Sequence, residues 1–218
     1  MWHCPARAAP EHVLSVLRSR SISGVSRRLT AEKGPEKAIR IARSARLPLR
    51  IAAKIPRAET AYFKTHLEPL INGKDVQLIG EVNDASKQGF LAEAAALLFP
   101  IDWPEPFGLV MIEAMACGTP VIAFRSGSVP EVIDDGVTGF IVESEEEAVD
   151  AVNKIARLDR RKVRRRFEER FSAHRMARAY ESHYRHLIAG TSIEPLIPTL
   201  RALRDPMGCP IAVAKPFE

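Results

Sequence analysis

The sequence contains no run of about eighteen apolar residues, so no segment predicts a helix that crosses a membrane. Its first twenty residues also lack the continuous apolar stretch of a signal peptide. The three cysteines, Cys4, Cys117 and Cys209, lie far apart and without the spacing of metal ligands, which predicts reduced thiols. Together these absences favour a cytoplasmic protein.

Several motifs of well-known enzyme classes are missing as well. The sequence has no G-x-G-x-x-G, G-x-x-x-x-G-K-[ST], H-E-x-x-H or G-x-S-x-G motif. This argues against nicotinamide-dependent dehydrogenases, P-loop enzymes, zincins and serine hydrolases. An Asp-x-Asp pair is also absent, so nothing predicts a metal ion that bridges a diphosphate. We therefore expect no metal and no cofactor.

Positive charge is plentiful but unevenly placed. The net charge is +5, yet residues 157–178 hold ten Arg or Lys against three acids, a local charge of +7. This stretch lacks the aromatic platforms and glycines of an RNA-binding surface, so nucleic-acid binding is not expected. A solvated helix face is the first interpretation of the run. The alternative is attraction to an anionic membrane surface, which would make the protein peripheral at the membrane.

Helical and strand-like segments alternate between about residues 34 and 188. Short apolar runs predict strands at 49–53, 76–80, 96–100, 120–124 and 139–142. Helical patterns fill the intervals, among them 35–46, which begins with a proline after Gly34, and 58–71. We further expect Asp84 and Ser144 to cap helices. The first strand, RSISGVSR, is the weakest prediction because it offers only two apolar residues, Ile22 and Val25.

Such alternation predicts parallel pairing through right-handed crossovers, hence a Rossmann-like, doubly wound α/β sheet. We expect one domain over 22–189, an irregular N-terminal segment over 1–21 and a C-terminal tail over 190–218. In folds of this type ligands lie beyond the carboxyl ends of the strands, so the loops after the strands are the places to search for a site.

One such loop reads Glu105-Pro106-Phe107-Gly108-Leu109. Pro106 suits the first position of a helix, which would leave the backbone N–H groups of Phe107, Gly108 and Leu109 pointing out of the helix start. A helix start of this kind binds anions, phosphate above all. Gly108 carries no side chain, so a phosphate could approach its backbone closely.

Two glutamates are associated with this helix. Glu113 stands almost alone in the apolar run 109–124, where a carboxylate is costly unless something pairs with it. Two turns into the helix, it could reach the hydroxyl pair of a ribose, while Glu105 would face the same crevice from the preceding loop. Trp103, which directly precedes Pro104, is interpreted as a packed loop anchor.

Two further clusters follow other strands. Arg28 and Lys33 bracket the turn after the first strand, and two cations there would neutralise a diphosphate without a metal ion. SGSVPEVI, residues 126–133, contains a glycine turn before a short helix and could present further backbone donors to a ligand.

The block EPFGLVMIEAMACGTPVIAFRSGSVPEVIDDGVTGFIVE resembles the signature of glycosyltransferase family 4, the retaining sugar-nucleotide transferases of the GT-B fold. Glu105 and Glu113 match the family's E-x7-E motif, and RLTAEKGP is similar to its GR-x4-KG segment; the resemblance runs from about Arg28 to Ile188. It implies that Glu105 contacts donor-sugar hydroxyls and Glu113 the ribose. It also implies that Arg28 and Lys33, with the amides of Phe107, Gly108 and Leu109, stabilise the diphosphate leaving group. Glu105, Arg28 and Lys33 are thus the expected catalytic residues, and the nucleotide sugar is the expected ligand.

Members of this family normally combine two Rossmann-like halves around the active site. At 218 residues the chain is expected to hold only the C-terminal, donor-binding half. A separate acceptor-binding chain or a homo-oligomer would then complete it, and catalysis by this chain alone stays open. The alternatives are a non-catalytic nucleotide-sugar-binding module, a subunit of a split transferase and a sugar-nucleotide epimerase.

Overall fold

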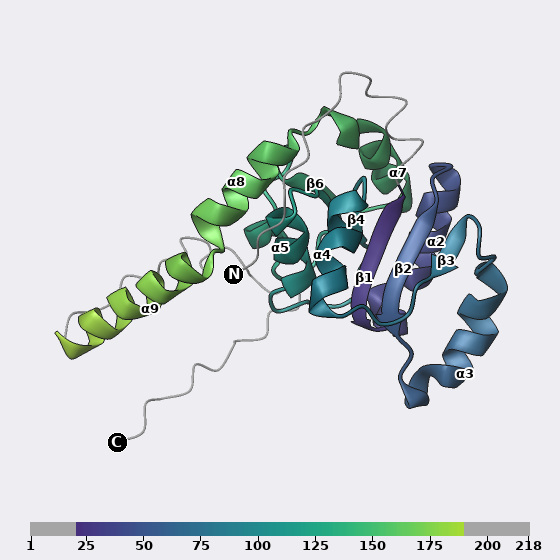
Figure 1. Ribbon diagram of the computed structural model, residues 1–218, viewed down its shortest axis with the longest axis horizontal. Helices are drawn as coiled ribbons and strands as arrows, with labels where there is room; N and C mark the ends of the chain where they lie inside the picture. The colour runs from purple at the N-terminus through teal and green to yellow at the C-terminus, as the bar shows by residue number, and fades with distance from the viewer. Residues whose placement is uncertain (1–20, 190–218) are drawn as a thin grey trace, which may run out of the picture. The chain divides into compact units, whose positions relative to one another are not determined.

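The computed structural model describes residues 21–189. The chain divides into two compact units, one that ends at Ser172 and one that begins at Ala173. In the first unit six parallel strands form one sheet in the order β3-β2-β1-β4-β5-β6 (Figure 1). The strands are β1 (Ile22–Arg28), β2 (Leu49–Lys54), β3 (Val76–Leu78), β4 (Leu97–Phe99), β5 (Val121–Phe124) and β6 (Gly139–Val142). The predicted doubly wound α/β fold is thereby confirmed.

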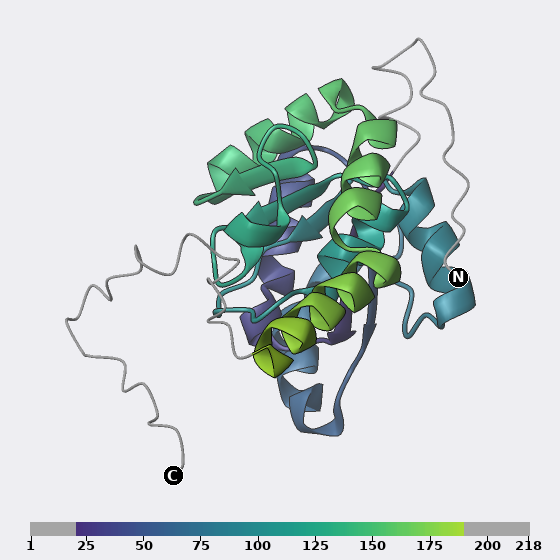
Figure 2. The ribbon, with the colours of Figure 1, turned by 90° about the vertical axis from the view of Figure 1, so that its left-hand side faces the viewer.

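Helices connect successive strands of this unit and cover both sides of the sheet (Figure 2). The α-helices are α2 (Pro35–Ser44), α3 (Thr60–Tyr62), α4 (Asp84–Glu93), α5 (Leu109–Ala116), α6 (Val129–Val132), α7 (Glu145–Lys154) and α8 (Arg160–Arg170). Shorter turns of 3₁₀ or π type are η1 (Ala31–Lys33), η2 (Arg57–Glu59), η3 (Phe63–Leu67), η4 (Glu68–Leu70) and η5 (Ile155–Arg157). The second unit is described through α9 (Ala173–Ile188).

Side chains that alternate along the strands divide the core between the two faces of the sheet. In β4, Leu98 joins the cluster built with α2 and α7, whereas Leu97 and Phe99 join the cluster built with α4, α5 and α8. β5 alternates in the same way, with all four of its residues buried. Burial on both faces explains why these strands appear in the sequence as short continuous apolar runs.

The strand that the sequence predicts most weakly lies at the centre of the sheet. β1 pairs with β2 on one side and with β4 on the other. Its first two residues, Ile22 and Ser23, are fully buried. The pairing register between β1 and β2 shifts between Val25 and Arg28. Two hydrogen-bonded neighbours supply the stabilisation that this strand's own composition does not.

The predicted starts of α2 and α7 are confirmed, whereas the cap of α4 and the helix over 58–71 differ from the prediction. Gly34 precedes α2, whose first residue is Pro35, and the Ser144 side chain accepts a hydrogen bond from the Glu147 amide at the start of α7. The cap of α4 is Asn83, which accepts from the Ser86 amide, so the prediction of Asp84 is wrong by one residue. The predicted helix over 58–71 is broken into 3₁₀, α and π turns, since Pro69 and the crowded β-branched and aromatic residues disfavour one regular helix.

The arginines of α8 bind the ends of other helices. Arg160 donates to the carbonyl oxygens of Ala92 and Ala94 at the end of α4, over 2.9 and 2.8 Å. Arg164 donates to the Ala116 carbonyl, the last residue of α5. These carbonyl groups have no partner within their own helices, and a cation near them also interacts favourably with the helix dipole.

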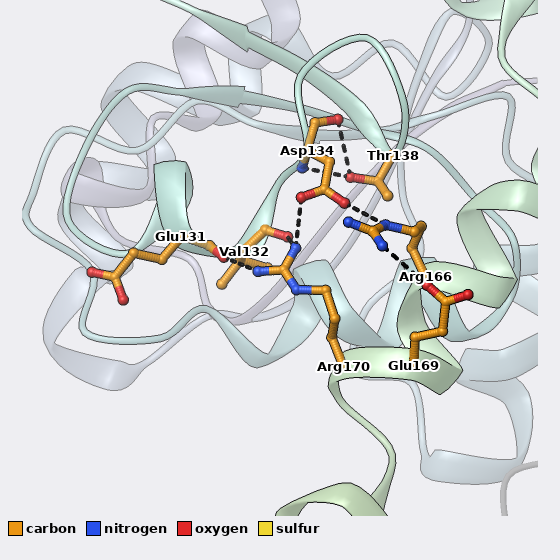
Figure 3. A network of polar contacts seen from close by, with 7 residues as sticks. All are labelled: Glu131, Val132, Asp134, Thr138, Arg166, Glu169 and Arg170. Atoms are coloured by element: carbon orange, nitrogen blue, oxygen red, sulfur yellow. Dashed lines mark hydrogen bonds and ion pairs between the residues drawn. The ribbon is translucent and has the colours of Figure 1, made fainter. Parts of the chain in front are cut away.

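At the C-terminal end of α8, Arg170 binds the carbonyl groups at the end of α6 (Figure 3). Arg170 donates to the carbonyl oxygens of Glu131 and Val132, and its guanidinium also lies 2.7 Å from Asp134 Oδ1. Arg166 Nε lies 2.7 Å from Asp134 Oδ2, so one carboxylate holds two arginines. The hydrogen bond that Arg166 donates to Asp134 raises the pKa of Arg166 above its usual value.

The basic run over 157–178 is therefore only partly a solvated helix face. That interpretation is wrong for the four arginines that bond within the fold, namely Arg160, Arg164, Arg166 and Arg170. It holds for the exposed residues Arg161, Lys162 and Arg165. Contact of this region with a membrane stays a prediction.

An ion pair joins α2 to α7 and predicts a small pH dependence of stability. Arg40 donates to both carboxylate oxygens of Glu145, and these hydrogen bonds lower the pKa of Glu145 below its usual range. A lowered pKa contributes stability above the pKa of the unfolded chain and loses it as the pH falls through the folded value. Because the pair is half-exposed, we expect Glu145→Gln to lower the free energy of unfolding by about 0.5 kcal/mol at pH 7. Urea unfolding measured at decreasing pH should show that the difference in the free energy of unfolding between wild type and Glu145→Gln vanishes in acid. The control is Glu146→Gln, a substitution at an exposed neighbouring residue. A difference that persists at low pH would contradict it.

No helix within residues 21–189 is long and apolar enough to span a bilayer. α9 carries exposed Met176, Tyr180, Tyr184 and Leu187 at helical spacing. The single domain over 22–189 stays a prediction. The predicted end segments, 1–21 and 190–218, lie outside the described residues except for Ser21.

Candidate functional site

Three loops meet at the carboxyl edge of the sheet, after the adjacent strands β1, β4 and β5. Hydrogen bonds connect them: the Asp102 amide donates to the Glu32 carbonyl over 2.9 Å, and Ser126 Oγ donates to the Trp103 carbonyl over 2.7 Å. The chain leaves β1 toward β2 on one side, while β4 flanks β1 on the other. The loops thus lie at the point where the strand order reverses, the usual ligand position in such sheets.

Glu105 is the centre of this junction. Its Oε2 atom accepts hydrogen bonds from Lys33 Nζ at 2.7 Å and from the Trp103 indole Nε1 at 3.0 Å. The side chains of Glu105 and Lys33 are only 17% and 22% exposed, so this ion pair is largely removed from water. Lys33 Nζ also lies 4.6 Å from the centre of the Trp103 ring, a cation–π distance. The structure therefore brings together two of the three predicted catalytic residues, which are far apart in sequence.

The turn that carries Lys33 is packed tightly against the loop after β4. Gly34 adopts a left-handed conformation with φ of 65°, and a Cβ atom at this position would lie 2.0 Å from the Pro100 carbonyl oxygen. Lys37 forms an ion pair with Asp102 beside it. Arg28, the third predicted catalytic residue, ends β1, and its side chain lies outside what the structure describes.

The loop with Trp103 and Glu105 rests on the turn after β5. The Ser128 amide donates to the Glu105 carbonyl over 2.9 Å, next to the bond from Ser126 to Trp103. Between them, Gly127 has a φ of 50°, and a Cβ atom there would lie 2.3 Å from the Glu105 carbonyl oxygen. The 126–133 segment was predicted to offer backbone donors to a ligand, but its Ser128 amide instead supports the Glu105 loop.

Glu113 finds its charged partner within the protein. Lys87 on α4 lies 3.0 Å from Glu113 Oε1 and 3.5 Å from Asp84. The Glu113 and Lys87 side chains are 23% and 18% exposed, which accounts for a carboxylate in an otherwise apolar run. In residues 21–189 no donor bonds the other oxygen, Oε2. That oxygen is free to accept a hydrogen bond from a ligand.

The start of α5 differs from the prediction. The helix begins at Leu109 with Gly108 as its N-cap, so Pro106 is not in the first helical position. Gly108 has a φ of 72°, a left-handed conformation that glycine adopts without strain. The amides of Phe107, Gly108 and Leu109 donate no hydrogen bond to any part of the described chain. These three backbone N–H groups thus have no partner in residues 21–189, and the helix starts later than predicted.

Sequence reasoning missed one member of this arrangement, Lys87, and the supporting role of another, the Ser126–Ser128 turn. Lys87 carries no signal beyond its place on a predicted helix, and the role of the Ser126–Ser128 turn becomes visible only when β4 and β5 are adjacent. The interpretation of Trp103 as a loop anchor fits the hydrogen bond that its carbonyl accepts from Ser126, but it does not include the hydrogen bond that its indole donates to Glu105. In the part of the chain that the structure covers, no cluster of three His, Cys, Asp or Glu side chains could hold a metal ion.

The sheet order, together with the loops at its carboxyl edge, defines a Rossmann-like domain of the type found in GT-B glycosyltransferases. The model of the family "Glycosyl transferases group 1" matches residues 17–173, and the chain belongs to this family. This confirms the family and the fold class that the sequence motifs predicted.

Individual relatives agree with this assignment. D-inositol 3-phosphate glycosyltransferase from Saccharomonospora viridis is 41% identical over 100 residues, which cover 41% of this chain and 23% of that relative. The crystal structure of AviGT4, a glycosyltransferase involved in avilamycin A biosynthesis, superposes with a TM-score of 0.67 at 26% identity, over 80% of this chain and 54% of that one. Anabaena HepE, solved in complex with UDP and glucose, shares the fold, with a TM-score of 0.62 at 23% identity over 78% of this chain and 50% of its own. The chain thus matches about a quarter to a half of the length of these relatives.

Proposed function

We propose that the chain binds a nucleoside-diphosphate sugar at the carboxyl edge of its sheet and serves as the donor-binding domain of a retaining glycosyltransferase. The observation that supports this most directly is the pair of glutamates, each with one oxygen fixed by a lysine and the other without a donor in residues 21–189. Two half-satisfied carboxylates beside three unused backbone amides suit a ligand that combines hydroxyl groups with phosphates.

The proposed roles follow from the chemistry of each group. Glu113 Oε2 would accept from the hydroxyls of the ribose, and Glu105 Oε1 from a hydroxyl of the sugar. Arg28, Lys33 and the amides of residues 107–109 would bind the diphosphate. When the glycosidic bond breaks, negative charge builds on the diphosphate, and fixed donors at that position stabilise the charge. Neither an enzyme nucleophile nor a metal ion is part of the proposal.

Calorimetric titration tests the donor site directly. The purified chain would be titrated with UDP, GDP and ADP and with their glucose or mannose conjugates. We expect one nucleotide series to bind, and Glu113→Ala to weaken that binding at least tenfold, about 1.4 kcal/mol. The loss is expected because the substitution removes the acceptor proposed for the ribose hydroxyls.

The control for this titration is Glu146→Ala, which removes an exposed glutamate in the first turn of α7 that forms no hydrogen bond or ion pair within residues 21–189. It should leave the affinity unchanged. Urea unfolding of both variants would show whether Glu113→Ala, which also removes the partner of Lys87, has merely destabilised the fold. If the wild-type chain binds none of these nucleotides or conjugates, the proposed donor site is wrong. It is also wrong if Glu113→Ala and Glu146→Ala bind the nucleotide with equal affinity.

A further inference from the structure

The two hydrogen bonds to Glu105 end on the same carboxylate oxygen. Lys33 Nζ and Trp103 Nε1 both donate to Oε2, and within residues 21–189 no donor bonds Oε1. A carboxylate held at one oxygen by two donors from different loops has little freedom to rotate. The free oxygen is therefore held in one direction, which is what a hydrogen bond to a specific hydroxyl group of a ligand requires.

The two donors differ in what an anionic ligand would do to them. Lys33 carries a mobile ammonium group with three protons, so a nearby diphosphate would compete with Glu105 for it. The indole N–H of Trp103 is neutral and has no rotatable proton. Its loop is fixed as well, because Ser126 Oγ donates to the Trp103 carbonyl over 2.7 Å. Trp103 is thus the donor that would stay on Glu105 while Lys33 turns toward phosphate.

We propose that Trp103 is a positioning residue: its indole N–H holds Glu105 Oε2 so that Oε1 faces the sugar of the donor. The residue thereby makes the site bind a nucleotide sugar more tightly than the bare nucleoside diphosphate. This inference rests on the proposed function. It adds to it the residue that directs the sugar-binding carboxylate.

Trp103→Phe tests the inference by removing the N–H group while keeping an aromatic ring under Lys33. Wild type and variant would be titrated with UDP and UDP-glucose, GDP and GDP-mannose, and ADP and ADP-glucose. The expected result is that the affinity for the bound sugar conjugate falls about tenfold, about 1.4 kcal/mol, while that for its bare diphosphate changes less than twofold. An equal loss for both ligands would mean that Trp103 only supports the fold, and no loss for either would also overturn the proposal. If the wild type binds no ligand at all, the proposed function fails first, and this inference fails with it.

A nuclear magnetic resonance measurement examines the same contact without any ligand. The chain has two tryptophans, so the ¹⁵N-labelled protein gives two indole signals, and the one that remains in Trp2→Phe belongs to Trp103. A hydrogen bond to a carboxylate is stronger than one to an amide, so Glu105→Gln should shift the indole proton signal of Trp103. A Trp103 signal that does not respond to this substitution would overturn the proposal, even where Trp103→Phe folds poorly.

Discussion

Replacement of Gly127 by alanine is expected to lower the free energy of unfolding by roughly 3 to 5 kcal/mol and to abolish binding at the proposed site. The residue has a φ of 50°, which strains any side chain, and the added methyl carbon would lie 2.3 Å from the Glu105 carbonyl oxygen and 2.6 Å from the Glu105 amide nitrogen. Both atoms belong to the backbone, so no flexible side chain can move out of the way. The loop must shift, and its bonds to Ser126 and Ser128 would break with it.

A second glycine separates the steric clash from the backbone strain. Gly136 has a φ of 70°, but nothing lies within 4 Å of a Cβ atom at that position. Gly136→Ala should therefore cost only about 1 kcal/mol, the strain of a left-handed alanine. Urea unfolding of both variants would measure the cost of the backbone strain alone and of strain plus steric clash. Titration of both variants with the nucleotide that the wild-type chain binds would show whether binding is lost. Equal losses of stability would show that the contact between Gly127 and Glu105 is not the cause.

Arg160→Ala should have the second largest effect, a loss of about 3 kcal/mol in the free energy of unfolding. The Arg160 guanidinium donates to the carbonyl groups of Ala92 and Ala94 and, at 2.7 Å, to Thr119 Oγ1. Thr119 is fully buried, and the two carbonyl groups belong to the end of α4. Alanine would leave these acceptors without their donor, a cost that is larger than the net worth of a hydrogen bond.

The control for this prediction lies on the same helix. Arg165 is exposed on α8, so Arg165→Ala removes the same charge and should change stability by less than about 0.5 kcal/mol. Thermal or urea unfolding measures both. A similar small loss in the two variants would mean that Arg160 contributes only as a surface charge.

The parts of this fold that the sequence predicts well are those determined by local chemistry. β4 and β5 appear as short apolar runs because both of their faces are buried, and the start of α7 is visible because Ser144 caps it. β1 is much harder to predict. Its residues gain their stability from β2 and β4, which are distant in sequence, so its own composition indicates little.

In the candidate site, too, some residues can be predicted from the sequence and others cannot. Glu113 is conspicuous because a carboxylate in an apolar stretch calls for a partner, and Glu105 because it stands in the loop before the same helix. The lysine partners were not predictable, because they are distant in sequence. Lys33 reaches Glu105, and Lys87 reaches Glu113, only in the folded chain. The start of α5 was misjudged for a local reason: Pro106 favours a helix start, but the left-handed Gly108 delays it to Leu109.

The arginines of α8 also determine how charge is distributed over the α/β unit. α4 and α5 end just before β4 and β5 begin, so Arg160 and Arg164 lie at the amino edge of the sheet, opposite the candidate site. β5 has four residues and spans roughly 13 Å, so these two cations lie on the order of that distance from an anion at the carboxyl edge. The electrostatic potential that such an anion meets depends mostly on nearer groups, among them Lys33 and Lys87 with their partners Glu105 and Glu113 and the backbone dipoles around α5, so the net charge of +5 says little about it.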